Sequence, residues 1–294
     1  MTPVVRLHDR DEIAEALERD ALLHIYEIGD LDDLFWPFTT WYARREGAHI
    51  EEIALVYKHT DLPVLIALRR EPVDGLVSLT RGIARFLPRR IYAHTSPGGT
   101  AALEASFAIE PHGAHLRMAL QEPARLGEID PMGAVPLAKE DLPEVEEFYG
   151  ASYPGNWFDP WMIETGAYFG IRRGGDLVCV AGVHVVSARG DVAALGNIAT
   201  RPDQRGQGLA AAATAALCRH LTEERGIGRI GLNVKADNAA AIACYAKLGF
   251  RTIATYDGSM CEALWAGSLG PTSSPTARIS SSALLFSTTP GRSR

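Results

Sequence analysis

Two glycines stand where a strand pattern in the second half of the chain turns into a helix pattern. The segment reads Gly196-Asn197-Ile198-Ala199-Thr200-Arg201-Pro202-Asp203-Gln204-Arg205-Gly206-Gln207-Gly208-Leu209-Ala210. The first turn of a helix leaves backbone N–H groups without an internal acceptor and carries partial positive charge. Gly206 and Gly208 remove side chains that would keep a phosphate away from those groups. The segment therefore predicts an anion-binding loop, and the alternative is a tight turn that merely needs glycine.

Two well-known nucleotide-binding loops do not fit this segment. Residues 206–211 match the pattern GxGxxA, but a dinucleotide-binding loop requires the strand to lead directly into the first glycine. Here residues 201–205 intervene, and the first acidic residue at the end of a strand beyond the helix region is Asp237. A Walker-type phosphate loop requires a Lys followed by Ser or Thr after the glycines, and neither follows Gly208.

The spacing Arg205-x-x-Gly208-x-Ala210 after a strand resembles the pyrophosphate loop of the GNAT superfamily of acyl-CoA-dependent N-acyltransferases. Residues 238–250, with Asn238, Ala241, Tyr245 and Gly249-Phe250, resemble that family's N-x-x-A-x-x-x-Y-x-x-x-G-F helix. The resemblance covers about residues 133–264. Within the superfamily, Gly196-Asn197-Ile198 is most similar to the branch related to glycine N-acyltransferases, which also has a degenerate GNAT-like N-terminal half.

The resemblance implies direct transfer of an acyl group from acetyl-CoA, or another acyl-CoA, to an amine. The backbone of residues 197–200 would bind the pantetheine arm, and the N–H groups of residues 205–210 would bind the pyrophosphate. Asn238 would contact the cofactor arm, and the Tyr245 hydroxyl would protonate the leaving thiolate. The cofactor-binding residues implied in this way are Asn197, Ile198, Ala199, Thr200, Arg205, Gly206, Gln207, Gly208, Leu209, Ala210, Asn238 and Tyr245. The alternative for Tyr245 is a packed helix aromatic.

The general base is not evident from the sequence. The strand pattern at residues 192–200 contains no acidic residue and no histidine. His184, on the neighbouring strand, is the catalytic candidate, although a lone strand histidine is more often structural. An α-amino group has a pKa of about 7.7–8.0 and would need only water as the acceptor of its proton.

An aromatic segment at residues 153–161 falls where the resemblance places the wall of the acceptor site. Its Trp157, Phe158 and Trp161 are the predicted substrate-binding residues. They would line an apolar or aromatic acceptor pocket, or they would simply cover the sheet.

The composition is typical of a globular protein of about two domains. The 294 residues are 47% hydrophobic and 22% charged. The net charge of −7 argues against a general nucleic-acid binder. Eight Lys or Arg and four Asp or Glu fall between Arg201 and Arg251, and this local excess of positive charge would attract the phosphates of coenzyme A.

Several further features exclude other classes of protein. No apolar stretch is long enough to cross a membrane, and the charged N-terminal segment does not resemble a signal peptide. The four cysteines stand singly, without the spacing of a zinc site or a disulfide framework, so no metal is expected. We predict a cytoplasmic protein, acting as a monomer or a homodimer, with no nucleic-acid or membrane partner.

The second half of the chain alternates strand and helix patterns. We expect strands at residues 134–138, 168–172, 177–186, 192–200, 229–234 and 250–256. We expect helices at residues 141–150, 209–225 and 238–248. Asp141 should cap the first of these helices, with Pro143 in its first turn and Glu144 completing a capping box.

The first half repeats that order weakly. Strands are predicted at residues 50–57, 64–68, 91–94 and 115–120, and helices at 73–86 and 100–108. We therefore predict an α/β (α+β) fold with a mixed, twisted sheet flanked by helices and duplicated in the N-terminal half; the alternative for that half is an unrelated α+β cap. The predicted domains are residues 1–131, residues 132–265 and a Ser/Thr-rich disordered tail at 266–294.

The main functional hypothesis is an N-acyltransferase, above all an N-acetyltransferase, acting on a primary amine of a small molecule or amino acid. Two alternatives stay open. One is a catalytically inactive acyl-CoA sensor, which the missing base would favour. The other is a protein or peptide N-acetyltransferase. In either active case the N-terminal half, which lacks a glycine-rich turn, would have lost CoA binding and would shape the acceptor cleft.

Overall fold

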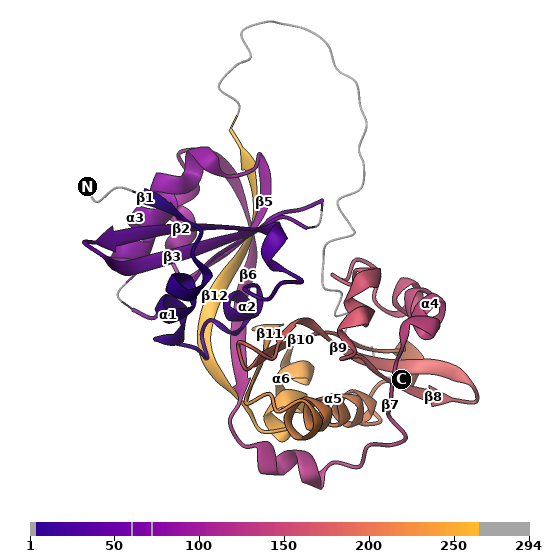
Figure 1. Cartoon of the computed structure of the whole chain (residues 1–294). Helices are drawn as coiled ribbons and strands as arrows, with labels where there is room; N and C mark the ends of the chain where they lie inside the picture. Colours follow the sequence, from indigo (N-terminus) through magenta and orange to yellow (C-terminus); the bar gives the residue numbers. More distant parts are fainter. Residues whose placement is uncertain (1–3, 60, 72, 265–294) are drawn as a thin grey trace, which may run out of the picture. The chain divides into compact units, whose positions relative to one another are not determined.

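The computed structural model describes residues 4–59, 61–71 and 73–264 (Figure 1). The predicted tail at 266–294 lies outside them. By internal contacts, the described residues divide into two compact units. The first comprises residues 4–123, 185–194 and 225–264, and the second comprises residues 124–184 and 195–224. The predicted domain boundary near residue 131 stays a prediction.

The same order of elements occurs twice along the chain, as the sequence suggested. The first series is β1 (Val4–Leu7), α1 (Arg10–Glu18), α2 (Ile25–Gly29), β2 (Thr39–Glu46), β3 (His49–Tyr57), β4 (Val64–Ala67), α3 (Asp74–Ile83), β5 (Arg90–Thr95), a 3₁₀ helix (Gly99–Leu103) and β6 (Phe107–Leu120). The second is β7 (Val135–Pro136), α4 (Leu142–Ser152), a 3₁₀ helix (Pro160–Thr165), β8 (Phe169–Arg173), β9 (Asp176–Ser187), β10 (Val192–Thr200), α5 (Leu209–Arg219), β11 (Arg229–Lys235), α6 (Ala239–Lys247) and β12 (Phe250–Ala263). The mixed α/β fold is therefore confirmed.

In the first unit, the last strand of each series pairs with strands of the other series. β12 pairs antiparallel with β5, for example Met260 with Tyr92, and also with β6 along its whole length. β6 in turn pairs antiparallel with β11, for example Gly231 with Ala119. The strand order from β5 is therefore β5-β12-β6-β11, and each series contributes its final strand to the pairing of the other.

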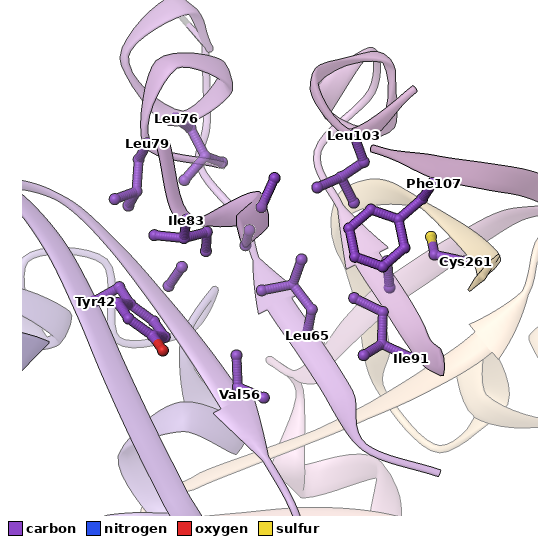
Figure 2. Packing of buried hydrophobic residues seen from close by; sticks show 14 residues of the cluster. Tyr42, Val56, Leu65, Leu76, Leu79, Ile83, Ile91, Leu103, Phe107 and Cys261 are labelled. Carbon is purple, nitrogen blue, oxygen red and sulfur yellow. The ribbon is translucent and has the colours of Figure 1, made fainter. Parts of the chain in front are cut away.

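One core of this unit lies between α3 and the sheet (Figure 2). Leu76, Leu79 and Ile83 fall on one face of α3 because they repeat at helical spacing, and all three are buried. They pack with Leu65 of β4 and Ile91 of β5. Phe107 and Cys261 extend the same cluster onto β6 and β12. The apolar patterns of these segments are thus explained by a single buried layer.

A buried ion pair and its hydrogen bonds join two strands and a helix in the first unit. The Arg117 side chain, on β6, is 1% exposed and donates a hydrogen bond of 2.9 Å to the Glu27 carboxylate on α2. It also donates to Asn233 Oδ1 on β11 and to the Leu23 carbonyl. Its guanidinium lies 4.8 Å from the ring centroid of Tyr26. No pattern in the sequence indicated this cluster.

Four elements of the first series were missed: β1, α1, α2 and β2. Helix α1 is capped by Asp9, whose carboxylate accepts the N–H groups of Asp11 and Glu12. Its sequence is so rich in charge that it reads as a solvated segment. Its Ile13 and Leu17 are nevertheless fully buried, which gives the helix an apolar face.

Three detailed predictions were wrong. Residues 100–108 form a short 3₁₀ helix and the start of β6 instead of an α-helix. Strand β12 does not end at residue 256 but continues to Ala263, because pairing on both sides satisfies its backbone through the Gly258 irregularity. The predicted capping box of α4 is absent: the Asp141 carboxylate accepts the Ala138 N–H, and Glu144 accepts the Leu177 N–H.

Candidate active site

The glycine-rich loop of the second unit has the backbone geometry that its sequence predicted. β10 ends at Thr200, and residues Pro202–Gln204 form one 3₁₀ turn. Gly206 and Gly208 then adopt left-handed conformations, with φ of 78° and 82°. A Cβ added to either glycine would meet no atom within 4 Å. Glycine is therefore required at these positions by the left-handed backbone conformation and not by a lack of space for a side chain.

Helix α5 begins directly after Gly208, so the loop presents a row of backbone donors. Within residues 206–212, Ala212 is the first whose N–H has an acceptor among the described residues. It donates to the Gly208 carbonyl at 3.0 Å. The N–H groups of residues 206–211 come before it, and the described residues provide them with no acceptor. Such a row at a helix start is suited to binding a phosphate.

Hydrogen bonds between side chains, and from a side chain to the backbone, stabilise the glycine-rich loop. Arg205 donates from Nε to the Thr200 carbonyl at 3.3 Å. Arg173, at the end of β8, donates to the side-chain oxygens of Gln204 and Gln207. Gln207 also donates to Gln204. The two glutamines therefore brace the loop, and the sequence analysis had not expected Arg173 to take part.

Asn238 and Tyr245 lie in the first unit, whereas the loop lies in the second. Asn238 is the N-cap of α6, and its Oδ1 accepts the Ala241 N–H at 3.2 Å. Tyr245 is 9% exposed, and its ring centroid lies 6.1 Å from that of Phe250. Asn238 thus has a structural role as a cap, and Tyr245 packs against a core aromatic; the cofactor contacts of both stay predictions.

The glycine of this second motif also has a structural reason. Gly249 has φ of 95°, and an added Cβ would lie 2.3 Å from the Glu122 carbonyl oxygen. Its own carbonyl accepts the N–H groups of Gln121 and Glu122. Any larger residue would break this close approach of two chain segments, so the Gly-Phe pair is explained without a ligand.

Asn197, the first of the predicted pantetheine-binding residues, is an exception within β10. It is 5% exposed and has φ of 53°, a left-handed conformation. The Tyr149 hydroxyl donates to its carbonyl at 2.6 Å. Its own Nδ2 donates to the Tyr168 hydroxyl at 3.0 Å. Sequence reasoning missed both tyrosines, although an Asn in an apolar strand is a signal that buried polar partners must exist.

His184, the candidate base, faces β10 directly. A Cβ on Gly196 would lie 2.0 Å from the imidazole, so this glycine makes room for the ring. Burial lowers the pKa of His184 to about 4. The imidazole is therefore neutral at physiological pH, but it is a weak base. It would take a proton from an ammonium group only at a large energetic cost.

The aromatic segment packs around the two tyrosines. The ring centroid of Phe158 lies 4.9 Å from that of Tyr149 and 5.6 Å from that of Tyr168. Trp157 and Trp161 are half-buried. Phe158 thus belongs to the surroundings of Asn197, while the roles of Trp157 and Trp161 toward an acceptor stay predictions.

The described residues give little support for a metal site, a reactive thiol or a membrane-spanning helix. No group of three or more His, Cys, Asp or Glu within it is arranged to hold a metal ion. Burial raises the pKa of the Cys218 thiol to about 12. Within the same residues, no helix is both long and apolar enough to cross a bilayer.

Comparison with known proteins now adds to this geometry. Residues 135–250 match the model of the acetyltransferase (GNAT) family. A mycothiol acetyltransferase of Catenulispora acidiphila is 28% identical over 287 residues, which cover 81% of this chain and 90% of that protein. The [ribosomal protein bS18]-alanine N-acetyltransferase of Escherichia coli K12 is 43% identical over 102 residues, 31% of this chain and 64% of that protein.

A solved structure described as a tandem GNAT protein from the clavulanic acid biosynthesis pathway has a similar fold. Its TM-score is 0.51 at 15% identity, and the match covers 92% of this chain and 99% of the other. At that identity the likeness concerns the fold alone.

The glycine loop, the fold and the family match together define an acyl-CoA-dependent N-acyltransferase. The match to the acetyltransferase (GNAT) family is confined to residues 135–250, which include the glycine-rich loop and helix α6. The inactive sensor that the sequence left open is not favoured, because both relatives are named as acetyltransferases.

Proposed function

We propose that this protein transfers an acetyl group from acetyl-CoA to a primary amine of a small molecule. The observation that carries the proposal is the loop at Gly206 and Gly208, whose left-handed glycines open the start of α5 to a phosphate. The N–H groups of residues 205–210 would bind the pyrophosphate. The backbone of residues 197–200 and the side chain of Asn238 would bind the rest of the cofactor.

The reaction requires few groups. The deprotonated amine nitrogen attacks the thioester carbonyl, a C–N bond forms, and the C–S bond breaks. The Tyr245 hydroxyl would protonate the leaving thiolate, and the proton that the nitrogen releases after its attack would return through water to Tyr245. His184 would pack beside the strand as a neutral ring. Trp157, Phe158 and Trp161 would form the acceptor wall.

A small acceptor is supported by the extent of the likeness. The match to the mycothiol acetyltransferase covers 81% of this chain and 90% of that protein. The match to the ribosomal-protein acetyltransferase involves only 31% of this chain. A protein acceptor is therefore the second candidate. The resemblance to glycine N-acyltransferases stays a prediction, as do the monomeric or homodimeric state and the cytoplasmic location.

The N-terminal series would not bind the cofactor. β4 and β5 pair in parallel from Val64 to Ala67, with Ala67 opposite Thr95. The pairing then continues beyond the strands: the Ser96 N–H bonds the Ala67 carbonyl, and Ser96 Oγ bonds both the N–H and the carbonyl of Arg69. These hydrogen bonds keep the chain joined just beyond the ends of β4 and β5, and among the described residues no pair of left-handed glycines follows β4.

The test of this function is the variant Tyr245→Phe. We expect kcat to fall by roughly 10²-fold, because a general acid contributes about 10²–10⁴-fold. The Kd for CoA, measured by calorimetry, should stay within a few fold because the packed ring remains. Equal losses of turnover and CoA binding would instead show that Tyr245 serves only packing.

The pH dependence of kcat/KM should follow the acceptor. With an α-amino acceptor, kcat/KM should rise with pH and level off above about pH 8, where the amine is deprotonated. The titration of His184, whose pKa is about 4, should leave no inflection between pH 5 and 9. His184→Gln should show the same profile. A wild-type inflection near pH 6.5 that this variant loses would identify His184 as the base.

A further inference from the structure

The second unit contains a buried polar network that the proposed reaction does not explain. We propose that Tyr149 and Tyr168 are positioning residues that fix a left-handed bulge at Asn197, and so set the backbone of β10 for the acyl-CoA thioester. This inference rests on the proposed function and deepens it. Neither tyrosine is proposed to touch the substrate; both act through Asn197.

The backbone at Asn197 is unusual for its place in the fold. Among the described residues, Met132, Asp191 and Asn197 are the non-glycine residues with positive φ. Met132 and Asp191 lie in connections, but Asn197 lies inside a strand. A left-handed residue in a strand interrupts the regular ladder and re-aims the chain. For a residue other than glycine, this conformation is unfavourable, so contacts with the surroundings must stabilise it.

Three hydrogen bonds stabilise the left-handed conformation of Asn197. Tyr149, on α4, donates to the Asn197 carbonyl at 2.6 Å. Asn197 Nδ2 donates to the Tyr168 hydroxyl at 3.0 Å. Tyr168 donates onward to the Val183 carbonyl on β9 at 2.9 Å. The Asn197 carbonyl is therefore bonded to helix α4, and the Asn197 side chain is linked through Tyr168 to strand β9.

Two glycines on the surrounding strands leave space for the side chains in and beside this network. Gly182, on β9, lies under Tyr168, where an added Cβ would fall 2.1 Å from the ring. Gly196 likewise makes room for His184, one residue before the bulge. Burial raises the pKa of both tyrosines, so both hydroxyls keep their protons throughout the working range of pH.

A purely structural explanation does not account for this arrangement. A buried hydroxyl, an amide and a strained backbone are each less favourable than an apolar side chain in a regular strand. The bulge immediately precedes Ile198, Ala199 and Thr200, and β10 then leads into the glycine loop. The network thus controls the direction of the backbone that the proposed function assigns to the pantetheine arm and the thioester.

Variants at Asn197 separate positioning from stability. Asn197→Gly loses the bond to Tyr168 but adopts the left-handed conformation without strain, whereas Asn197→Ala loses the bond and opposes that conformation. We expect the alanine variant to lose about 30-fold in kcat/KM for acetyl-CoA, and the glycine variant to lose several-fold less because it keeps the left-handed backbone.

Tyr149→Phe tests the other side of the network. It leaves the Asn197 carbonyl buried without its donor, and we expect kcat to fall about tenfold, because a shift of the reacting groups by a fraction of an ångström is sufficient. The matched control is Tyr42→Phe in the core of the first unit, which should leave kcat and KM unchanged. Tm is measured for every variant.

The outcomes are distinct. Loss of activity in Asn197→Ala and Tyr149→Phe, with rescue in Asn197→Gly, supports the inference. Losses of Tm without changes in kcat or KM would contradict it, since the network would then serve only the fold. If the wild-type protein neither binds nor turns over acetyl-CoA, the proposed function fails, and this inference fails with it; binding and turnover of the wild type together with unaffected variants would overturn the inference alone.

Discussion

Gly208→Glu is expected to abolish the binding of CoA and acetyl-CoA. Gly208 is left-handed, with φ of 82°, and it stands immediately before α5. A glutamate there would place a carboxylate where the pyrophosphate should lie, and it would force a side chain into a conformation that favours glycine. Calorimetric titration should show micromolar binding to one site in the wild type and a Kd raised at least about 100-fold in the variant.

The matched control for this experiment is Gly226→Glu. Gly226 is also left-handed, with φ of 67°, and an added Cβ there also meets no atom within 4 Å. It follows the end of the α5 segment instead of preceding its start, so it introduces the same charge and backbone strain away from the loop. Equal losses of CoA binding in the two variants would contradict the assignment of the loop.

Arg117→Leu is expected to destabilise the protein by about 3–5 kcal/mol, because it leaves the buried Glu27 carboxylate without its cation. The Glu27 and Arg117 side chains are 4% and 1% exposed. Chemical denaturation at pH 7, followed by tryptophan fluorescence, would measure the loss. A change below about 1 kcal/mol would show that Glu27 is already neutral in the folded protein.

Two controls make this result specific. Arg189→Leu removes an ion pair with Asp11 whose side chains are 70% and 84% exposed, and it should produce no measurable change. The double variant Arg117→Leu/Glu27→Gln removes the uncompensated charge, and it should recover a substantial part of the loss.

The pH dependence gives a second readout of the same pair. Burial alone would raise the pKa of Glu27, but Arg117 and His24 outweigh burial and lower it to about 2. A carboxyl whose pKa is lowered by folding stabilises the protein above its unfolded value, near pH 4.5, and this contribution is lost as the pH falls toward about 2. The deficit of Arg117→Leu relative to the wild type should therefore shrink on acidification.

Motifs and periodic patterns predicted most of the strands and helices of the second series, although not the end of β12 or the cap of α4. Strand β10 has the bounds that its apolar pattern predicted, Val192–Thr200. Gly206 and Gly208 adopt the left-handed conformations for which glycine is suited. These features depend on neighbours along the chain, so local sequence specifies them.

Elements whose stability comes from distant partners were poorly predicted. Residues 257–263 include Asp257, Gly258 and Glu262 and do not resemble a strand, yet pairing with both β5 and β6 makes them one. Helix α1 reads as a charged surface segment until its buried face is known. Asp141 suggested a helix cap, but its carboxylate bonds the Ala138 N–H instead.

The sequence by itself predicted the glycine-rich loop, because that loop consists of consecutive backbone groups and needs glycine at fixed spacing, and the reaction class was implied by the resemblance of its motifs to a known family. Only the tertiary structure decided how the polar side chains combine. Arg117 and Glu27 are 90 positions apart, and Tyr149 and Asn197 are 48 apart. A buried charge or hydroxyl needs one particular partner across that distance, and no local pattern in the chain specifies which residue folding will bring to it.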